Sequence, residues 1–547
     1  MENLSEKLKE IVKGEVIADS EGKKKFRRDT SIFDIEPQVV VAPATEEDIQ
    51  HIVNFVRENK KKHPELSITA RSAGTDMSGG TLTDSIMLDF IPHFNHLKVV
   101  SNKYFISQPG VYFRDIEKKL TERGKMYPPY PASKDLCAVG GLVNNNSGGE
   151  KTYQYGKTNK FIEELEMVLS DGNIYRFKKL TKKELEEKMK QKDFEGEIYR
   201  KMWDLVMHNQ EVIKNSRPQV SKNSSGYNIW DIWDGEYFDL TQVICGAQGT
   251  LGMLTEAEMR IVHKPKHEKL YVAFMKNMDN LPQFVNDVLP LKPTSVEITD
   301  EHTFKIYLRY AREMASILGT GGLFNTMKLF WPETKLVLRH GMPKLITLVE
   351  FEGDETKDLN FEMNELDKIV KKYKSMTGRK VKTKLEAEKY WKLRRDTFKL
   401  LREKIKDKHS TPFVDDLIVK PADLPEFWPQ LTKILDEEKL FYTVSGHLAD
   451  GNLHIIPVMD LRDPKERAKI YPSTDKVYDL IFKYKGSITA EHNDGLIRGP
   501  YLEKEFGKEV FGIFKEIKKI FDPENIFNPH KKTGATLEYA QSHMITD

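Results

Sequence analysis

Two histidines on either side of a tight turn are the residues of this sequence best suited to holding a metal ion. In the segment SGHLADGNLHIIPV, His447 and His454 flank Asp450-Gly451-Asn452. A turn at Asp-Gly-Asn can bring two flanking strand residues together, and imidazole is a common ligand of divalent transition metals. Isolated histidines more often have a structural role, so the pair by itself leaves both interpretations open.

A glutamate and a third histidine could complete such a centre. In GSITAEHNDGLIRGPYL, Glu491 and His492 follow a β-prone run and precede a glycine turn. Adjacent residues on a strand point to opposite sides, whereas an irregular turn lets both serve one site. The alternative interpretation is an exposed Glu-His pair in a loop.

Three glycine-rich segments could hold a large anionic ligand. They read ARSAGTDMSGG, VGGLVNNNSGGEKTYQYG and CGAQGTLGMLTEAEM, and each joins glycines to Ser, Thr or Asn beside an apolar run. Such loops can aim successive backbone N–H groups at one anion and let the backbone approach it closely. A single glycine loop is also typical of an ordinary turn, but three favour an extended ligand such as a dinucleotide. The G-x-G-x-x-G pattern of a nicotinamide-binding Rossmann unit is missing from the sequence.

These segments, together with PATEEDI and PPYPASKD, resemble in order the PCMH-type FAD-binding domain of the vanillyl-alcohol-oxidase flavoproteins, and the resemblance extends over nearly the whole chain. It implies that FAD is bound by a diphosphate loop of Arg71, Ser72, Ala73, Gly74, Thr75, Asp76, Ser78 and Gly79, a flavin-side group of Pro129, Ser133, Gly140, Gly141, Asn144, Ser147 and Gly148, and a third loop of Gly246, Gly249, Thr250 and Gly252. Some members of this superfamily attach FAD through a histidine in the first loop. Gly74-Thr75-Asp76 stands there in this chain, so we expect non-covalent FAD.

The two histidine motifs together, H-x-x-D-G-N-x-H and A-E-H, resemble the D-lactate, D-2-hydroxyglutarate and glycolate dehydrogenase branch of the same flavoproteins. This resemblance implies that His447, His454 and Glu491 bind a divalent metal and that His492 is the catalytic base. The chain departs from the commoner E-H-G form because Asn493-Asp494 follows the histidine. That form is associated with members that work beside iron–sulfur modules.

Further site residues follow from the same resemblance. The family has an arginine on a helix after a tryptophan, and YWKLRRDTF points to Arg394 as the reader of the substrate carboxylate, with Arg395 as the adjacent competitor. The FNP of FDPENIFNPHKK is similar to a tail that returns to the flavin, which makes Asn528 a candidate. Dicarboxylate-oxidising relatives have polar residues near the positions of Val414 and Ile456, so the apolar residues here favour a small or apolar substrate side chain.

The resulting expectation is an enzyme that oxidises a D-2-hydroxy acid to the 2-oxo acid. D-lactate is the leading substrate, and D-2-hydroxyglutarate and glycolate are the alternatives. A metal ion (Zn, Mn, Fe or Co) would orient the substrate, and His492 would take the hydroxyl proton as hydride leaves for the flavin. Electrons would then pass to a cytochrome, a quinone, an iron–sulfur protein or an electron-transferring flavoprotein. Two rivals are a flavin-bearing electron-transfer subunit, against which the metal motifs argue, and a non-catalytic small-molecule-binding protein.

Alternating short strands and helices must position these motifs, so we predict an α+β fold. In PATEEDIQHIVNFVREN, Thr45 can cap a helix whose apolar residues Ile49, Ile52 and Val53 recur at helical spacing. Asp171-Gly172 lies between two β-prone runs and predicts a hairpin, because these residues tolerate the positive φ of the turn.

The order of motifs predicts four segments. Residues 1–32 would form an N-terminal helical extension, and residues 33–266 the two-subdomain FAD-binding domain. Residues 267–485 would form an α+β cap that carries the metal-binding histidines. Residues 486–547 would return to the FAD-binding domain and complete the active site.

Composition narrows the class of protein. Lys+Arg 86 against Asp+Glu 84 leaves a net charge of +2, which gives no electrostatic footprint for nucleic acid. The two cysteines, Cys137 and Cys245, exclude a disulfide framework and an iron–sulfur cluster within the chain, so an iron–sulfur module would be a separate subunit. No apolar run reaches the roughly 20 residues of a membrane span, and no export signal is present. We expect a cytoplasmic protein whose membrane contact, if any, is peripheral to the inner membrane.

Overall fold

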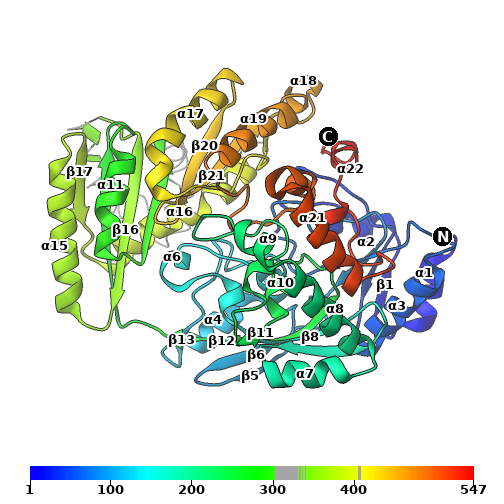
Figure 1. The fold of residues 1–547 in the computed structure, drawn as a ribbon. Helices are drawn as coiled ribbons and strands as arrows, with labels where there is room; N and C mark the ends of the chain where they lie inside the picture. The colour runs from blue at the N-terminus through cyan, green and yellow to red at the C-terminus, as the bar shows by residue number, and fades with distance from the viewer. Residues whose placement is uncertain (302–330, 332–333, 336, 339–340, 405–407, 547) are drawn as a thin grey trace.

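A computed structural model describes residues 1–301, 331, 334–335, 337–338, 341–404 and 408–546. The described chain contains three sheets of four or more strands and two sheets of two strands, and the three larger sheets organise the fold (Figure 1). The fold is α+β, as the sequence predicts. None of the described helices has the length and apolar character needed to cross a membrane.

The first sheet is small and has the strand order β1-β2-β4-β3. The strands are β1 (Glu15–Ile17), β2 (Val39–Ala42), β3 (Ile68–Arg71) and β4 (Ile86–Asp89). Two helices, α1 (Leu4–Ile11) and α3 (Glu46–Asn59), pack on this sheet through one apolar core. The predicted N-terminal extension therefore contributes a strand as well as helices.

Helix α3 begins where the sequence predicts, because the Thr45 side chain accepts a hydrogen bond from the Asp48 backbone N–H. Its apolar residues Ile49, Ile52 and Val53 are fully buried. Burial of each such side chain contributes about 1.5–3 kcal/mol. This packing fixes the sheet from which the first glycine-rich loop leaves at the end of β3.

The second sheet is antiparallel, with the order β5-β6-β12-β8-β9. Its strands are β5 (Leu97–Val100), β6 (Tyr104–Ser107), β8 (Ile162–Val168), β9 (Ile174–Lys178) and β12 (Met253–Arg260). The predicted hairpin is confirmed, since β8 and β9 pair across a turn in which Gly172 has a φ of 83°. The core on this sheet includes residues of α4 (Phe113–Thr121), α5 (Val139–Asn144), α8 (Phe194–His208), α10 (Thr241–Ile244) and α21 (Leu502–Phe521).

The third sheet forms the cap, in the order β17-β14-β16-β15-β20-β21-β18, with β19 also paired to β21. Its strands are β14 (His267–Met275), β15 (Ser295–Asp300), β16 (Leu345–Gly353), β17 (Met376–Lys380), β18 (His409–Ser410), β19 (Leu417–Ile418), β20 (Tyr442–His447) and β21 (Asn452–Met459).

Helices cover the cap sheet on two sides. One large core includes residues of α11 (Leu281–Val288), α15 (Thr356–Lys372), α17 (Leu424–Glu437) and α19 (Ile470–Lys483), and these helices lie on the outer side of the cap (Figure 1). A smaller core joins Tyr390 and Trp391 of α16 (Lys384–Lys404) to Val272 and Leu348 on the other face of the sheet. Helix α16 therefore lies on the face that carries the predicted site.

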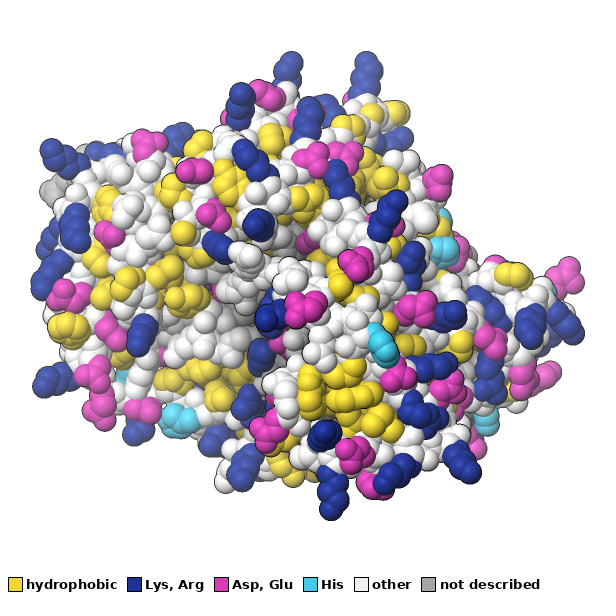
Figure 2. Space-filling model, in the orientation of Figure 1, with side chains coloured by type: hydrophobic (Ala, Val, Ile, Leu, Met, Phe, Trp, Pro, Cys, Tyr) yellow, Lys and Arg dark blue, Asp and Glu magenta, His cyan; other side chains and the backbone are white. Residues whose placement is uncertain are grey.

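The C-terminal tail returns to the N-terminal half, as predicted. Phe527 forms a β-bridge with Ile68, and the Ile545 backbone N–H donates to the Ile32 carbonyl. Figure 2 shows Lys, Arg, Asp and Glu side chains interspersed over the face of the molecule that it draws, as the balanced composition suggests.

Candidate active site

A cavity of about 680 Å³ lies where the glycine-rich segments meet the cap. Residues from all three segments line it, and the cap contributes residues of α16, β20 and β21. The volume lies within the range of roughly 300–1,000 Å³ that small-molecule and cofactor sites occupy. The three distant glycine segments thus share one cavity, which is what an extended ligand requires.

Gly141 lies in the wall of this cavity, and its backbone conformation is one that any residue could adopt. Gly141 lies in α5, outside the residues with positive φ, and an added Cβ would meet no atom within 4 Å. A side chain there would instead extend into the cavity. Space for a ligand explains glycine at this position, so the wall fits a bound cofactor.

The first glycine loop presents a concave row of backbone donors. None of the backbone N–H groups of residues 73–77 donates a hydrogen bond to the described part of the chain. The Asp76 carboxylate accepts hydrogen bonds from the N–H groups of Ser78 and Gly80 and from the Asn145 amide. These hydrogen bonds let the carboxylate hold the loop in shape. The free N–H groups suit a diphosphate.

The residues predicted to contact FAD fall into two groups. Those that line the cavity are Ser72, Ala73, Gly74, Thr75, Asp76, Ser133, Gly140, Gly141, Asn144, Ser147, Gly148, Gly249 and Gly252. Those that lie outside the lining are Arg71, Ser78, Gly79, Pro129, Gly246, Thr250 and Asn528.

Two residues of the second group, Arg71 and Asn528, make structural hydrogen bonds to the backbone instead. The Arg71 guanidinium donates to the carbonyls of Phe26 and Arg28 and so braces the loop on the N-terminal segment. The Asn528 side chain donates to the carbonyls of Gly80 and Gln248, and its oxygen accepts from Thr69. Because these hydrogen bonds occupy its amide group, Asn528 ties the C-terminal tail to the loops rather than facing the cavity.

The predicted histidine pair lies on a β-hairpin. Strands β20 and β21 pair across the Asp-Gly-Asn turn, with His447 opposite Asn452 and Ser445 opposite His454. The two imidazoles are therefore diagonal neighbours on one face, and their ring centroids are 5.1 Å apart. Both residues line the cavity and are buried.

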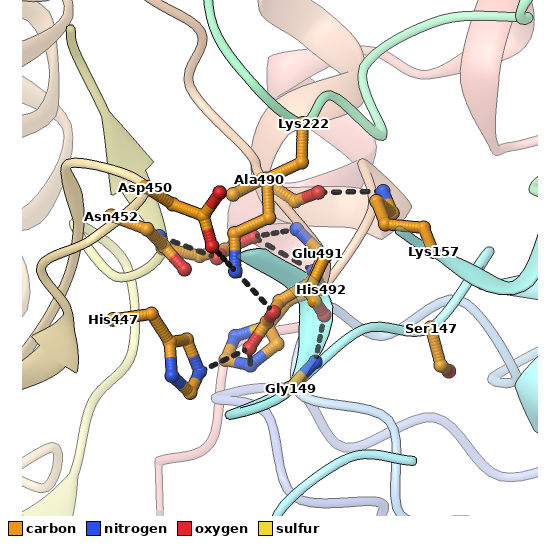
Figure 3. Close-up of polar contacts among 12 residues, drawn as sticks. Ser147, Gly149, Lys157, Lys222, His447, Asp450, Asn452, Ala490, Glu491 and His492 are labelled. Atoms are coloured by element: carbon orange, nitrogen blue, oxygen red, sulfur yellow. Dashed lines mark hydrogen bonds and ion pairs between the residues drawn. The ribbon is translucent and has the colours of Figure 1, made fainter. Parts of the chain in front are cut away.

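Glu491 reaches the same point from the C-terminal segment. Its Oε1 atom lies 3.1 Å from His447 Nε2 and 3.4 Å from His454 Nε2. The chain around Glu491 is irregular rather than a strand, so the adjacent His492 also faces this centre, with its ring stacked on His454 at 4.9 Å. A lysine of the FAD-binding part, Lys222, holds the other oxygen of Glu491 at 2.8 Å (Figure 3).

These distances fit a shared cation. Ligands of a tetrahedral zinc ion, at about 2.1 Å from the metal, are separated by roughly 3.3 Å. The outer nitrogen of each imidazole meets a carboxylate: His447 Nδ1 lies 2.6 Å from Glu297, and His454 Nδ1 lies 3.2 Å from Asp415. Such outer partners fix the tautomer that leaves Nε2 free to bind a metal. His447, His454 and Glu491 therefore form a chemically suitable set of ligands.

Charge around the centre also favours a cation. Burial disfavours the charged form of His454, but the carboxylates of Asp415 and Glu491 outweigh it and raise the pKa of His454 to about 9. Burial likewise opposes ionisation of Glu491, yet Lys222 and His447 hold its pKa well below the usual range. The buried acids thus favour positive charge at His454, and a divalent ion bound beside its Nε2 would meet the same attraction.

Among the described residues, the ligand atoms of Asp416, His454, Glu491 and His492 lie within 4.8 Å of one another, and this group does not include His447. The Asp416 Oδ2 atom, however, accepts from the backbone N–H groups of both Glu491 and His492 and from the Thr489 hydroxyl. These hydrogen bonds leave Asp416 poorly suited to bind a metal. Its position instead holds the backbone that presents the glutamate and the third histidine.

His492 has the geometry of a general base. Its Nδ1 atom lies 2.6 Å from Asp415 Oδ2, so a neutral ring keeps its proton there and leaves Nε2 as an acceptor. Burial lowers the pKa of His492, but Asp416 and Asp415 outweigh that effect and raise it above the ordinary value. One carboxylate, Asp415, therefore orients both a candidate metal ligand and the candidate base.

The two candidate arginines differ in their partners. Arg394 Nε donates to Glu297 at 3.0 Å, and its terminal nitrogens have no partner among the described residues. Arg395 donates to both oxygens of Glu150 through Nε and Nη2. Both arginines line the cavity, but only Arg394 retains an open edge for a carboxylate.

The sequence interpretation missed several residues of this centre. Asp415 and Asp416 occur within the apolar run FVDDLIV, and two acids in such a run are a usable signal of buried carboxylates. Glu297 interrupts a β-prone run in the same way. Lys222 carries no local signal. Of the two positions tied to substrate size, Ile456 lines the cavity, whereas Val414 belongs to the buried core.

Two family models match the chain. A model described as "FAD binding domain" matches residues 37–178, and one described as "FAD linked oxidases, C-terminal domain" matches residues 264–532. The chain therefore contains an FAD binding domain followed by a C-terminal domain of the FAD linked oxidases. The match to the second model includes the histidine hairpin, Glu491 and His492.

The chain is similar in sequence to curated proteins and similar in fold to a solved structure. The chain is 27% identical over 527 residues to a D-2-hydroxyglutarate dehydrogenase of Pseudomonas putida, covering 95% of this chain and 50% of that protein. It is 26% identical over 500 residues to a glycolate oxidase subunit of Bacillus subtilis, covering 90% and 88%. A 4-ethylphenol oxidase from Gulosibacter chungangensis has the same fold, with a TM-score of 0.68, 15% identity and coverage of 96% and 95%.

The relatives differ in length. The chain spans about half the length of several of the curated relatives that it matches.

Proposed function

We propose that this protein oxidises a D-2-hydroxy acid to the 2-oxo acid, with non-covalent FAD and a divalent metal, and passes the electrons to an external acceptor. The supporting observation is the convergence of His447 Nε2 and His454 Nε2 on Glu491 Oε1 at the wall of the cavity shared by the glycine loops. The names of two relatives, a 2-hydroxyglutarate dehydrogenase and a glycolate oxidase subunit, support this class of substrate.

Each chain residue has a definite role in this proposal. FAD, when bound, accepts the C2 hydrogen as hydride, and the metal, when bound, supplies a Lewis acid for the substrate oxygens. His447, His454 and Glu491 would hold the metal. Arg394 would bind the substrate carboxylate with its terminal nitrogens, since Glu297 anchors its Nε.

The hydroxyl proton would move to His492. Its Nε2 atom is the free acceptor because Nδ1 faces Asp415. Loss of that proton and of the C2 hydride converts the C2–OH group into a carbonyl, so a 2-oxo acid leaves. The two electrons removed from the substrate would need an external acceptor, for which we propose a cytochrome, a quinone, an iron–sulfur protein or an electron-transferring flavoprotein.

Among D-2-hydroxy acids, we propose D-lactate as the substrate. The cavity's two arginines are each paired with a buried glutamate, Arg394 with Glu297 and Arg395 with Glu150. A second substrate carboxylate would meet no uncompensated cation among the described lining residues, and burying it would cost several kcal/mol. D-2-hydroxyglutarate and glycolate remain the alternatives.

Anaerobic bleaching of the flavin absorbance tests the proposal. We expect D-lactate to bleach the purified protein, and a chelator to suppress bleaching until a divalent metal is restored. His492→Ala should keep its FAD but lose substrate-driven reduction. Wild-type rates in that variant would refute the role of the base, and flavin left on acid-precipitated protein would refute non-covalent attachment. An electron-transfer subunit or a binding protein would show no bleaching by any 2-hydroxy acid.

A further inference from the structure

Two hydroxyl groups stand next to the candidate metal ligands on the same sheet face. Thr443, Ser445 and His447 alternate along β20, and all three line the cavity. The register places Ser445 directly opposite His454, and Thr443 directly opposite Ile456. The hydroxyls therefore follow the metal ligands in order along the strand, at intervals of roughly 6.7 Å for two residues.

Neither hydroxyl has a hydrogen-bond partner among the described residues. Thr443 is only 4% exposed, and its neighbour Val444 points into the core on the opposite face. Ser445 is half-buried at the cavity wall. Both residues line the cavity and their hydroxyls have no partner among the described residues, so a ligand in the cavity can supply one.

The charges nearby define the kind of partner. A carboxylate on the substrate side chain would compete for Arg395, which Glu150 already engages through both of its oxygens. Burial raises the pKa of Glu150, but Arg395 outweighs it and lowers that pKa to about 2, so this glutamate stays ionised. The apolar side chain of Ile456 lies beside Thr443 on the same sheet face and lines the same cavity. A neutral hydrogen-bonding group fits this surrounding better than a second anion.

We propose that the substrate is a 2-hydroxy acid whose side chain carries further hydroxyl groups, with Ser445 binding a hydroxyl at C3 and Thr443 binding one at C4. This inference rests on the proposed oxidation at C2 and defines its substrate class. The additional hydroxyls are bound and not consumed: only the C2–H and its own O–H are broken. The site thereby selects polyhydroxylated acids over simple alkyl ones.

Matched pairs of acids test the proposal on the FAD- and metal-containing protein. D-glycerate differs from D-lactate by one hydroxyl at C3, and D-2,4-dihydroxybutanoate differs from D-2-hydroxybutanoate by one at C4. Because leaving a buried hydroxyl unsatisfied is costly, we expect each hydroxylated acid to bleach the flavin about tenfold more efficiently, as the rate constant divided by the apparent Kd.

Variants assign the preference to single residues. Ser445→Ala should reduce the glycerate-to-lactate ratio about tenfold and leave the C4 ratio unchanged. Thr443→Val, which keeps the side-chain shape, should reduce the C4 ratio about tenfold and leave the glycerate-to-lactate ratio unchanged. Thr443→Ser should retain the C4 preference. Flavin and metal contents measured on each variant confirm that it is loaded.

The possible outcomes separate this inference from the function on which it rests. If D-lactate and D-glycerate bleach the flavin equally well, or if the ratios survive in both variants, the hydroxyl-binding role is wrong while the oxidation stands. If no 2-hydroxy acid bleaches the flavin, the proposed function fails and this inference fails with it. Should a variant not fold, the wild-type ratios alone decide.

Discussion

Replacing Asp415 with asparagine tests the most connected residue of the candidate site. The two oxygens of Asp415 receive different imidazoles, with Oδ1 at 3.2 Å from His454 Nδ1 and Oδ2 at 2.6 Å from His492 Nδ1. Asparagine offers one acceptor oxygen, and its NH₂ group cannot accept from an imidazole N–H. One of the two rings must therefore lose its partner or change tautomer.

The expected loss of activity in Asp415→Asn follows from the loss of one of these two hydrogen bonds. A hydrogen bond to a charged group contributes about 1.5–3 kcal/mol, and losing an outer partner of a metal ligand lowers metal affinity or activity about 10–100-fold. We expect Asp415→Asn to reduce the rate of flavin bleaching by 2-hydroxy acids about 10–100-fold. FAD content should not change, because Asp415 lies in the cap and not in the glycine loops.

The pH profile provides a second readout with a definite sign. Asp416 and Asp415 raise the pKa of His492 despite its burial, and a general base works only when it is deprotonated. The wild-type rate should therefore fall as pH drops through this raised pKa. Removing the Asp415 charge lowers the pKa, so the acid limb of the kcat/KM profile should move to lower pH in the variant.

A matched substitution controls for general effects. Asp460→Asn changes the same functional group at a partly exposed position of the cap, where the carboxylate pairs with Arg462. That variant should keep wild-type rates and an unchanged pH profile. If Asp415→Asn bleached the flavin at the wild-type rate with its acid limb in place, Asp415 would not orient the base.

Three further substitutions probe other parts of the structure. Gly141→Val should abolish the retention of FAD on gel filtration, because the valine side chain would enter the cavity. A native circular dichroism spectrum would show that the variant still folds. Full flavin content in the variant would contradict the prediction. Lys222→Met should lower the affinity for the metal about 10–100-fold, because Glu491 loses its partner at 2.8 Å. Elemental analysis after dialysis measures the bound metal, and Lys222→Arg should recover part of the affinity. Unchanged metal affinity in Lys222→Met would argue against this role of Lys222. Burial lowers the pKa of Lys157 to about 7, so the unfolded chain binds more protons between pH 7 and 10.5 and this lysine makes stability rise with pH there. Urea unfolding at pH 7 and pH 9 should show a smaller rise for Lys157→Met than for the wild type, and equal rises would contradict this reasoning.

Local patterns in the sequence are sufficient to predict these secondary-structure elements and the proximity of two of the three proposed metal ligands. Helix α3 follows from the Thr45 cap and its apolar spacing, and the β8–β9 hairpin follows from Asp171-Gly172, because both depend on residues that are close in the chain. The same is true of His447 and His454. Their turn forces the two strands together, so their proximity needs no information from the rest of the protein.

Tertiary structure alone decides what surrounds the histidine pair. Adjacent residues on a regular strand point apart, and only the irregular backbone held by Asp416 lets Glu491 and His492 face one centre. The roles of the two arginines are likewise set by Glu297 and Glu150, which lie 97 and 245 positions away.

The same holds for the supports behind the site. Lys222 comes from the FAD-binding part and meets Glu491 across 269 positions of sequence, as Figure 3 shows. Contacts between residues so far apart in the sequence follow no periodicity or spacing that a sequence pattern can express. The residue types determine which chemistry is possible, but the packing of the cap and tail against the FAD-binding sheets decides which carboxylate, lysine or arginine meets each imidazole.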